Sequence, residues 1–200
     1  MVIVFLGPDG SGKSTVIQHL ISDPNPFFVD KYVFHLRPMI FEPHKRRHSS
    51  PVTNPHGEVP RGSIMSVLKL FYLLLDYSVG HILDVRLRSR QNSLVIFDRY
   101  YHDMLIDPRR YRFQKPMWLA KWIGRIIPKP DMWLLLDSPP EIMYSRKKEV
   151  PYEETQRQRK AYLAFIDSQS NAYVVDSSTS IEKTVANVNK IIQAYLKPSF

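Results

Sequence analysis

Residues 7–15 read GPDGSGKST, directly after the apolar run VIVFL and directly before VIQHLI. Gly7 is followed by four residues and then by Gly12, Lys13 and Ser14, which is the phosphate-binding loop pattern in the strand-loop-helix context that it requires. Its glycines allow positive φ angles and let the main chain approach a ligand closely. The stretch therefore predicts a loop that holds phosphate groups at the N-terminus of a helix.

The other side chains of the loop suit a magnesium nucleotide. Lys13 supplies a mobile positive charge for the outer phosphates, and the Ser14 hydroxyl is a ligand type that Mg²⁺ accepts. An ordinary glycine-rich turn before a lysine is the alternative, but it does not account for the strand before the loop and the helix after it. The nucleotide-binding residues predicted here are Gly7, Asp9, Gly10, Ser11, Gly12, Lys13, Ser14 and Thr15.

Length and composition indicate one soluble domain over residues 1–200. The chain is 44% hydrophobic and has no cysteine, which excludes disulfides, zinc-thiolate sites and cysteine catalysis and fits a cytoplasmic location. We expect no secretory signal, because the first apolar stretch ends at Gly7. The longest apolar region carries charged residues, among them Lys69 and Asp76, so we do not expect it to span a membrane.

The net charge of +9 indicates anionic partners. The positive residues do not resemble a nucleic-acid recognition helix, since they gather in a proline-rich stretch and in DPRRYRFQK at 107–115. We interpret them as solvated surface charges and, for a few, as anion-binding loops, and we expect no nucleic-acid partner. They are Lys45, Arg46, Arg47, Arg61, Arg109, Arg110, Arg112 and Lys115.

Strand and helix patterns alternate along the chain. This alternation predicts an α/β fold in three layers, with a five-stranded parallel sheet flanked by helices. The predicted strands are 2–6, 29–36, 93–98, 131–137 and 172–176, and the main predicted helices are 13–21, 63–90, 116–127 and 181–196. Residues 37–62 contain five prolines and little periodicity, which predicts an irregular insertion on the acceptor side.

Two of these helices have pronounced apolar faces. The helix at 63–90 repeats apolar residues at helical spacing, and we expect protein to cover it; they are Ile64, Leu68, Phe71, Leu75, Val79 and Ile82. The helix at 116–127 gathers Trp118, Trp122 and Ile126 on one face, with Lys121 and Arg125 beside them. Core or homodimer packing is one interpretation of this face, and contact with an anionic membrane surface is the other.

LVIFDRYYHDM at 94–104 supplies the second set of polar residues. Asp98 follows four apolar residues at a strand end, where it can orient Mg²⁺ or accept a proton, and Arg99 can clamp a phosphate. The alternative is an Asp-Arg surface pair. Because ligands of parallel sheets bind at the carboxyl ends of strands, we expect the loop, Arg37, Asp98-Arg99 and Asp137 at one edge of the sheet.

These motifs together resemble the thymidylate kinase branch of the nucleoside monophosphate kinases, over almost the whole chain. The matching stretches are FLGPDGSGKST at 5–15, HLRP at 35–38, DRY at 98–100, LLLDSPPEIMYSRKK at 134–148, RQRKAYL at 157–163 and VVDSSTSIEKTV at 174–185. The phosphate-binding loop alone occurs in many folds, whereas the ordered set is far more specific.

The resemblance implies a P-loop NTPase fold with a short lid at about 146–158, and ATP as the phosphoryl donor. It implies that Asp9, Arg37, Asp98, Arg99 and Tyr100 contact the acceptor, and that Ser177 lies beside adenine. A cation of the lid would assist transfer, with Arg146, Lys147, Lys148 and Arg157 as candidates. The resulting catalytic set is Lys13, Asp98, Arg99, Arg146 and Arg157, with Ser14 and Asp98 on the metal.

The chain departs from the family at the acceptor side. The Ser and Gln that usually follow the Asp-Arg-aromatic motif are replaced by YHDMLIDPRRYR at 101–112, and LLLDYS at 73–78 stands where another Arg is frequent. Gly10 occupies a position where one subgroup has a catalytic Arg.

These residues leave several acceptors and functions open. A nucleoside monophosphate such as dTMP is the expected acceptor, and a sugar or surface glycan is the alternative. A nucleic-acid-stimulated ATPase is a third hypothesis, while a GTPase is disfavoured because LLLDSPPE stands where a guanine-reading segment would follow.

Overall fold

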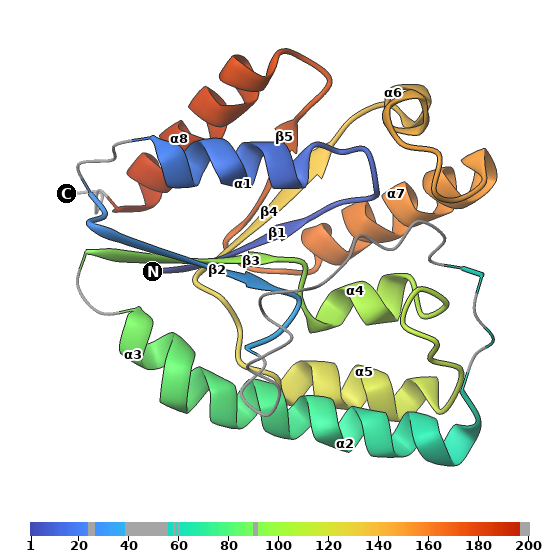
Figure 1. The fold of residues 1–200 in the computed structure, drawn as a ribbon. Coiled ribbons are helices and arrows are strands. Elements are labelled where there is room, and N and C mark those ends of the chain that lie inside the picture. Colours follow the sequence, from blue (N-terminus) through green and yellow to red (C-terminus); the bar gives the residue numbers. More distant parts are fainter. Residues whose placement is uncertain (24–26, 39–55, 58, 60, 90–91, 197–200) are drawn as a thin grey trace. The chain divides into compact units, whose positions relative to one another are not determined.

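The computed structural model describes residues 1–23, 27–38, 56–57, 59, 61–89 and 92–196. The expected insertion at 37–62 and its cations Lys45, Arg46 and Arg47 therefore lie largely outside the described residues. Within the described ranges the polypeptide alternates between strands and helices, and the elements follow the predicted order (Figure 1).

Five strands form one sheet in the order β2-β3-β1-β4-β5. The strands are all parallel, and the sheet is flanked by helices. The strands are β1 (Val2–Leu6), β2 (Asp30–His35), β3 (Ser93–Asp98), β4 (Met132–Asp137) and β5 (Ala172–Asp176). The predicted α/β fold with a five-stranded parallel sheet is confirmed.

The helical segments differ in length from the predictions mainly at the ends. The long predicted helix is divided by a π-helical segment, η2, and three further helices follow β3 and β4. They are α1 (Lys13–Ser22), α2 (Ser63–Gly80), η2 (His81–Val85), α3 (Arg86–Arg88), α4 (Tyr101–Ile106), α5 (Met117–Ile126), α6 (Pro140–Arg146), α7 (Tyr152–Asp167) and α8 (Ile181–Leu196).

The chain divides into two compact units. Unit 1 consists of Met1–Val4 and Phe27–Asp131, and unit 2 of Phe5–Pro26 and Met132–Phe200. In unit 1, β2 and β3 pair in parallel from Asp30↔Ser93 to His35↔Asp98. In unit 2, β4 and β5 pair in parallel from Trp133↔Ala172 to Asp137↔Asp176. The last pair of each register contains aspartate at the carboxyl end of a strand. This is Asp98 in unit 1, and Asp137 with Asp176 in unit 2.

The cores of both units follow from nearly continuous apolar strands. Every residue of β1 is buried, and so are the first five residues of β3 and of β4. Strands that are buried on both faces read as unbroken apolar runs, because helices cover a parallel sheet on both sides. In unit 2, α8 packs against α1 and β5, while α7 packs against β4 and β5 (Figure 1).

The apolar stripe of α2 faces solvent, so the prediction that protein covers it is wrong for this chain. Ile64 is 79% exposed, Leu68 57% and Leu75 56%. The face of α2 that is buried in unit 1 instead contains Ser66, Leu70, Leu73, Asp76, Tyr77 and Gly80. The hydrophobic periodicity predicts the wrong buried face of α2. The face that packs into unit 1 includes polar side chains, and these form hydrogen bonds within the unit.

The segment Ser63–Arg88 also meets the length and composition expected of a membrane-crossing helix, with a mean hydropathy of 1.3 in its most apolar 18-residue window. Of that window, 33% is buried in the structure. Its buried residues include Asp76, whose carboxylate pairs with Arg37 of the same unit. These contacts are those of a helix that packs on a globular core.

Helix α5 shows the same contrast. Trp118 is 71% exposed, Trp122 51% and Ile126 46%, while Ala120, Ile123 and Gly124 are buried. Core packing of the tryptophan face is therefore wrong for this chain. The homodimer and membrane interpretations of residues 116–127 stay predictions.

Candidate active site

Three glycines give the loop at residues 7–15 its shape. Gly7, Gly10 and Gly12 have φ angles of 143°, 80° and 89°. A Cβ atom at Gly10 would lie 2.2 Å from the carbonyl oxygen of Met143, and one at Gly7 would lie 2.7 Å from the carbonyl oxygen of Leu136. Any side chain at these two positions would displace main-chain atoms of unit 2, so the backbone requires glycine there.

Lys13 holds the loop together from inside. Its side chain is buried at 6% exposure, and its Nζ atom donates hydrogen bonds to Gly7 O at 2.6 Å and to Pro8 O at 2.8 Å. A third, longer contact of 3.3 Å reaches Ser11 Oγ. The structure thus brings the predicted Lys13, Gly7 and Ser11 together, with the ammonium group at the centre of the loop.

The helix that follows the loop has the features of an anion site. Gly12 is the N-cap of α1 in the left-handed conformation, and no side chain caps the first turn. Uncapped N–H groups at a helix N-terminus favour negative charge, both as donors and through the helix dipole. Ser14 and Thr15 are exposed on this first turn, and Asp9 and Gly10 are half-buried. Phosphate oxygens fit such a cradle.

A second group of polar residues in unit 2 joins the ends of β4 and β5. Ser177 donates through its main-chain N–H to Asp137 O at 2.8 Å, and its hydroxyl lies 2.8 Å from Ser138 Oγ. Arg159 of α7 pairs with Asp137 through two contacts of 2.7 Å each. The predicted Ser177 is therefore fixed in a network, next to a carboxylate that an arginine already neutralises.

The predicted lid cations all lie in unit 2, where Lys148 lies 5.6 Å from the Tyr144 ring centroid and the other three form polar contacts. Arg146 ends α6 and donates to Ser177 O at 2.9 Å, Arg157 pairs with Glu154 at 2.6 Å, and Lys147 pairs with Glu149 at 2.7 Å. Residues 147–151 connect α6 to α7. Arg146 is thus tied to the segment predicted to contact adenine, and Arg157 is an exposed side chain on the first turns of α7.

In unit 1, the backbone is strained directly after β2 and directly after β3. Leu36 and Arg99 have φ angles of 65° and 73°, which are rare for residues with a Cβ atom. The Leu36 N–H donates to Asp98 O at 2.9 Å, and the Tyr77 hydroxyl donates to Leu36 O. Surrounding bonds hold these conformations, and strain of this kind clusters at functional sites.

The Asp98-Arg99-Tyr100 triplet is divided between solvent and core. The Asp98 carboxylate lies 3.5 Å from His35 Nδ1 and is partly accessible, whereas Arg99 is buried and reaches Asp103 at 3.4 Å. Tyr100 is 3% exposed, and its hydroxyl donates to Pro128 O at 2.6 Å. Burial raises the pKa of the Tyr100 hydroxyl well above its usual range. Tyr100 therefore packs as a core residue, and its expected contact with the acceptor stays a prediction.

Arg37 meets α2 at a buried carboxylate. Its Nη1 atom lies 3.0 Å from Asp76 Oδ2 and also donates to the Tyr72 hydroxyl, with the guanidinium 4.9 Å from the Tyr72 ring centroid. Asp76 is completely buried. Burial would lower the pKa of Arg37, but the contacts with Tyr72 and Asp76 raise it. Arg37 is thus held as a cation in a fixed orientation.

A cavity of about 300 Å³ opens beside Arg37, and all of its lining residues belong to unit 1. Three of them are cationic and four are tyrosines, so the lining combines positive charge with aromatic surface. The lining residues are Leu36, Arg37, Arg61, Lys69, Tyr72, Leu73, Tyr77, Tyr101, Met104 and Tyr111.

Sequence reasoning found only Arg37 among these as a site residue. Lys69 and Asp76 did carry a signal, because two charges in an otherwise apolar helix must face solvent or a partner. On its own, that signal argues against a membrane span but does not identify a partner for either charge. The tyrosines carried none, since aromatic residues in a helix are usual core residues.

No protein-family model matches the chain. The chain is 26% identical to a protein of Archaeoglobus fulgidus named "Probable thymidylate kinase" over 208 residues, covering 98% of this chain and 96% of that one. It is 33% identical over 115 residues to "Probable thymidylate kinase 1" of Saccharolobus solfataricus, covering 54% of this chain and 59% of the other.

Two solved structures share the fold of this chain. The thymidylate kinase of Ehrlichia chaffeensis matches with a TM-score of 0.63 and 15% identity, over 96% of this chain and 98% of that one. The thymidylate kinase of Candida albicans gives a TM-score of 0.63 and 17% identity, over 96% and 91%. The chain is a thymidylate kinase-like P-loop kinase. The phosphate-binding loop of this kinase lies in unit 2 and its Asp98-Arg99 pair in unit 1; their expected place in one cleft stays a prediction.

Proposed function

We propose that this kinase transfers the γ-phosphoryl group of ATP to a nucleoside monophosphate that resembles dTMP. The observation that carries the proposal is the glycine loop around the buried Lys13, whose form only glycine permits at Gly7 and Gly10. The curated relatives add support, because the similarity to proteins named as thymidylate kinases extends over 98% of this chain.

The donor side of the reaction rests on residues of unit 2. Main-chain N–H groups of residues 7–15 and the Lys13 ammonium would bind the triphosphate, and Ser177 would lie beside the adenine. Lid residues Arg146 and Arg157 would then approach the equatorial oxygens of the transferred group. Such contacts lower the barrier because they act on charge that spreads over the phosphoryl oxygens in the transition state.

The acceptor side rests on unit 1. Arg37 and Arg99 would orient the acceptor phosphate, while Asp9, Asp98 and Tyr100 complete the predicted acceptor contacts. An acceptor phosphate oxygen forms a bond to the γ-phosphorus, and the bond from that phosphorus to the β,γ-bridging oxygen breaks. The bond's electron pair stays on the bridging oxygen, so the products are ADP and a nucleoside diphosphate. The attacking oxygen of a phosphate dianion has no proton to lose.

Oxygen ligands suited to Mg²⁺ are present on both sides. Ser14 is exposed on the first turn of α1, and the Asp98 carboxylate is partly accessible at the end of β3. Mg²⁺, when bound, neutralises charge on the β- and γ-phosphates. We propose Ser14 and Asp98 as the residues that hold it, directly or through water, in a cytoplasmic enzyme.

A transfer assay tests the proposal. The purified chain is incubated with γ-labelled ATP, Mg²⁺ and a panel of nucleoside monophosphates, nucleosides and sugars, and labelled products are separated by ion exchange. We expect labelled nucleoside diphosphate with dTMP or a close analogue, and none when Mg²⁺ is chelated. Label on a sugar, or only on inorganic phosphate, would overturn the acceptor class.

A further inference from the structure

The cavity in unit 1 contains more positive charge than one acceptor phosphate uses. Arg37 already has a carboxylate partner in the fully buried Asp76. Arg61 and Lys69 also line the cavity, and among the described residues neither belongs to an ion pair. An acceptor phosphate at Arg37 therefore leaves two further cations beside the same ligand.

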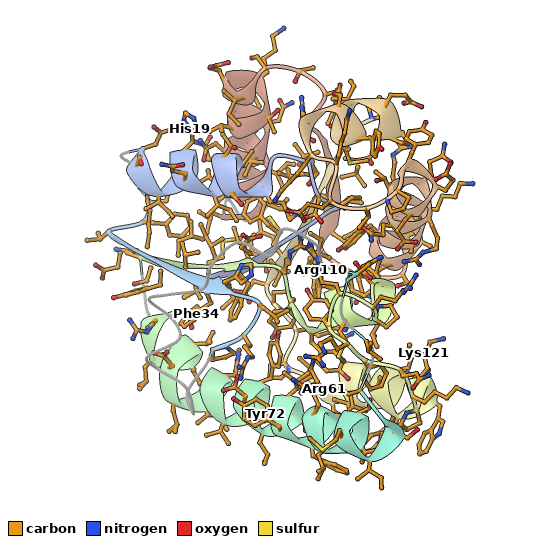
Figure 2. The ribbon with its side chains drawn as sticks, turned by 45° about the vertical axis from the view of Figure 1, so that its right-hand side comes forward. His19, Phe34, Arg61, Tyr72, Arg110 and Lys121 are labelled. Carbon is orange, nitrogen blue, oxygen red and sulfur yellow. The ribbon has the colours of Figure 1, made fainter. Side chains whose placement is uncertain are left out.

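Lys69 and the two residues that Arg37 contacts lie at different positions along helix α2. Arg37 lies against Tyr72 and Asp76, whereas Lys69 precedes them by one and two helical turns, about 5–10 Å along the axis. Arg61 lies just before the start of α2, at the same end as Lys69, and Figure 2 labels it together with Tyr72 beside this helix. The positive charge of the cavity thus has two ends.

The Lys69 end is built and partly removed from water. Lys69 is half-buried, its Nζ atom donates to Tyr111 O, and it lies 5.8 Å from the Tyr111 ring centroid. Desolvation, followed by repulsion from Arg61, Arg37 and Arg112, lowers the pKa of Lys69 to about 8. A lysine held among arginines and away from water is costly unless an anion compensates it.

We propose that this cavity binds an acceptor with two anionic groups: its phosphate at Arg37, and a second acidic group at Lys69 and Arg61. The proposal rests on the proposed function, because it names the kind of acceptor that the kinase would use. The lining tyrosines, Tyr72, Tyr77, Tyr101 and Tyr111, supply aromatic surface for a flat ring between the two ends.

Binding of three matched nucleotides tests the second anion site. Isothermal titration without ATP compares dTMP, its 3′-phosphorylated form, and 5-carboxy-2′-deoxyuridine 5′-monophosphate. The 3′-phosphate adds about −1.5 to −2 charge on the sugar, and the carboxylate adds one negative charge on the base. We expect one of them to bind at least tenfold more tightly than dTMP, and which one shows whether the second group lies on the sugar or on the base.

Substitutions assign the gain to the two cations. Lys69→Met and Arg61→Gln remove one charge each, and we expect each to abolish most of the preference for the ligand with a second acidic group, because that ligand loses more affinity than dTMP does. Lys121→Met is the matched control, since Lys121 is an exposed lysine of α5 in the same unit (Figure 2). Thermal melting checks that the variants fold, and the exposed Arg61 gives an independent result should Lys69→Met not fold.

Failure of this inference differs from failure of the proposed function. Equal or weaker binding of both acidic analogues than of dTMP, or a preference that survives in both variants, overturns the second anion site while transfer from ATP to dTMP stands. No transfer to any nucleotide overturns the proposed function, whereas the titrations still report whether Lys69 and Arg61 bind an anion.

Discussion

The phosphate-binding loop and the cavity in unit 1 are built in opposite ways. The loop is one contiguous stretch, GPDGSGKST, whose ligand groups are main-chain N–H donors and a lysine that its own carbonyls hold. The cavity collects side chains from a strand end, from α2 and α4, and from two loop positions. A site made of backbone is limited to one sequence pattern, whereas a site made of dispersed side chains can change its chemistry one residue at a time.

The buried ion pair between Arg37 and Asp76 lies beside the cavity, and we expect its loss to have the largest effect on stability. We expect Asp76→Ala to lower the free energy of unfolding by about 3–5 kcal/mol, because Arg37 would lose the carboxylate that compensates it inside unit 1. Urea denaturation measures the loss. Asp84→Ala is the control, since Asp84 pairs with Arg88 near the surface of the same helical segment and should cost less than about 1 kcal/mol. Equal losses of unfolding free energy in the two variants would show that burial does not make the Arg37–Asp76 pair more stabilising than the surface pair.

The loop should be most sensitive at Lys13. We expect Lys13→Ala to reduce kcat about 100- to 1000-fold, equivalent to about 3–4 kcal/mol of barrier, because an electrostatic contact with the transferred group is lost. Lys13 also bonds to Gly7 O and Pro8 O, so circular dichroism must show an unchanged fold before the rate is interpreted. Steady-state transfer to dTMP measures the effect. A variant that retains the parent rate would remove the loop from the mechanism.

Substitution of two glycines of the loop distinguishes the cost of backbone strain from the cost of a steric clash. Both Gly10 and Gly12 have positive φ, but a Cβ at Gly10 would lie 2.2 Å from Met143 O, whereas nothing lies within 4 Å of one at Gly12. We expect Gly12→Ala to cost about 1 kcal/mol, from the left-handed conformation alone, and Gly10→Ala about 2 kcal/mol or more. Chemical denaturation and ATP titration compare the two variants. A larger loss at Gly12 would contradict this order.

The same contrast explains how much the sequence could predict. The strands and the loop were readable because each depends on neighbouring residues: apolar runs give buried strands, and three spaced glycines give the loop. The buried face of α2 could not be predicted in this way. Leu68 and Leu75 are exposed, whereas Asp76 is buried because it pairs with Arg37, which is distant in sequence. Pattern arguments assume that apolar residues face inward, and a buried polar network breaks that assumption.

The cavity in unit 1 could not be predicted for a related reason. Arg61, Lys69 and Tyr111 are separated in sequence, and only the packing of unit 1 makes them line one cavity. The resemblance to thymidylate kinases predicts roles for Arg37 and Asp98, yet it indicates no residue for the part of the cavity where this chain departs from the family. Long-range contacts between side chains decide such a region, and no local pattern encodes them.

The titration of Lys69 gives the smallest effect and the finest distinction. Because desolvation and the neighbouring Arg61, Arg37 and Arg112 lower the pKa of Lys69 to about 8, this side chain is mostly charged at pH 7 and mostly neutral at pH 9. The acceptor phosphate is already a dianion in this interval, since its second pKa is about 6. We therefore expect the KM for the acceptor with two acidic groups to rise about tenfold from pH 7 to pH 9, equivalent to about 1.4 kcal/mol. Lys69→Arg keeps its charge over this range and should give a flat profile. A rise of the same size in Lys69→Arg would assign the titration to another group and separate the cavity's pH response from Lys69.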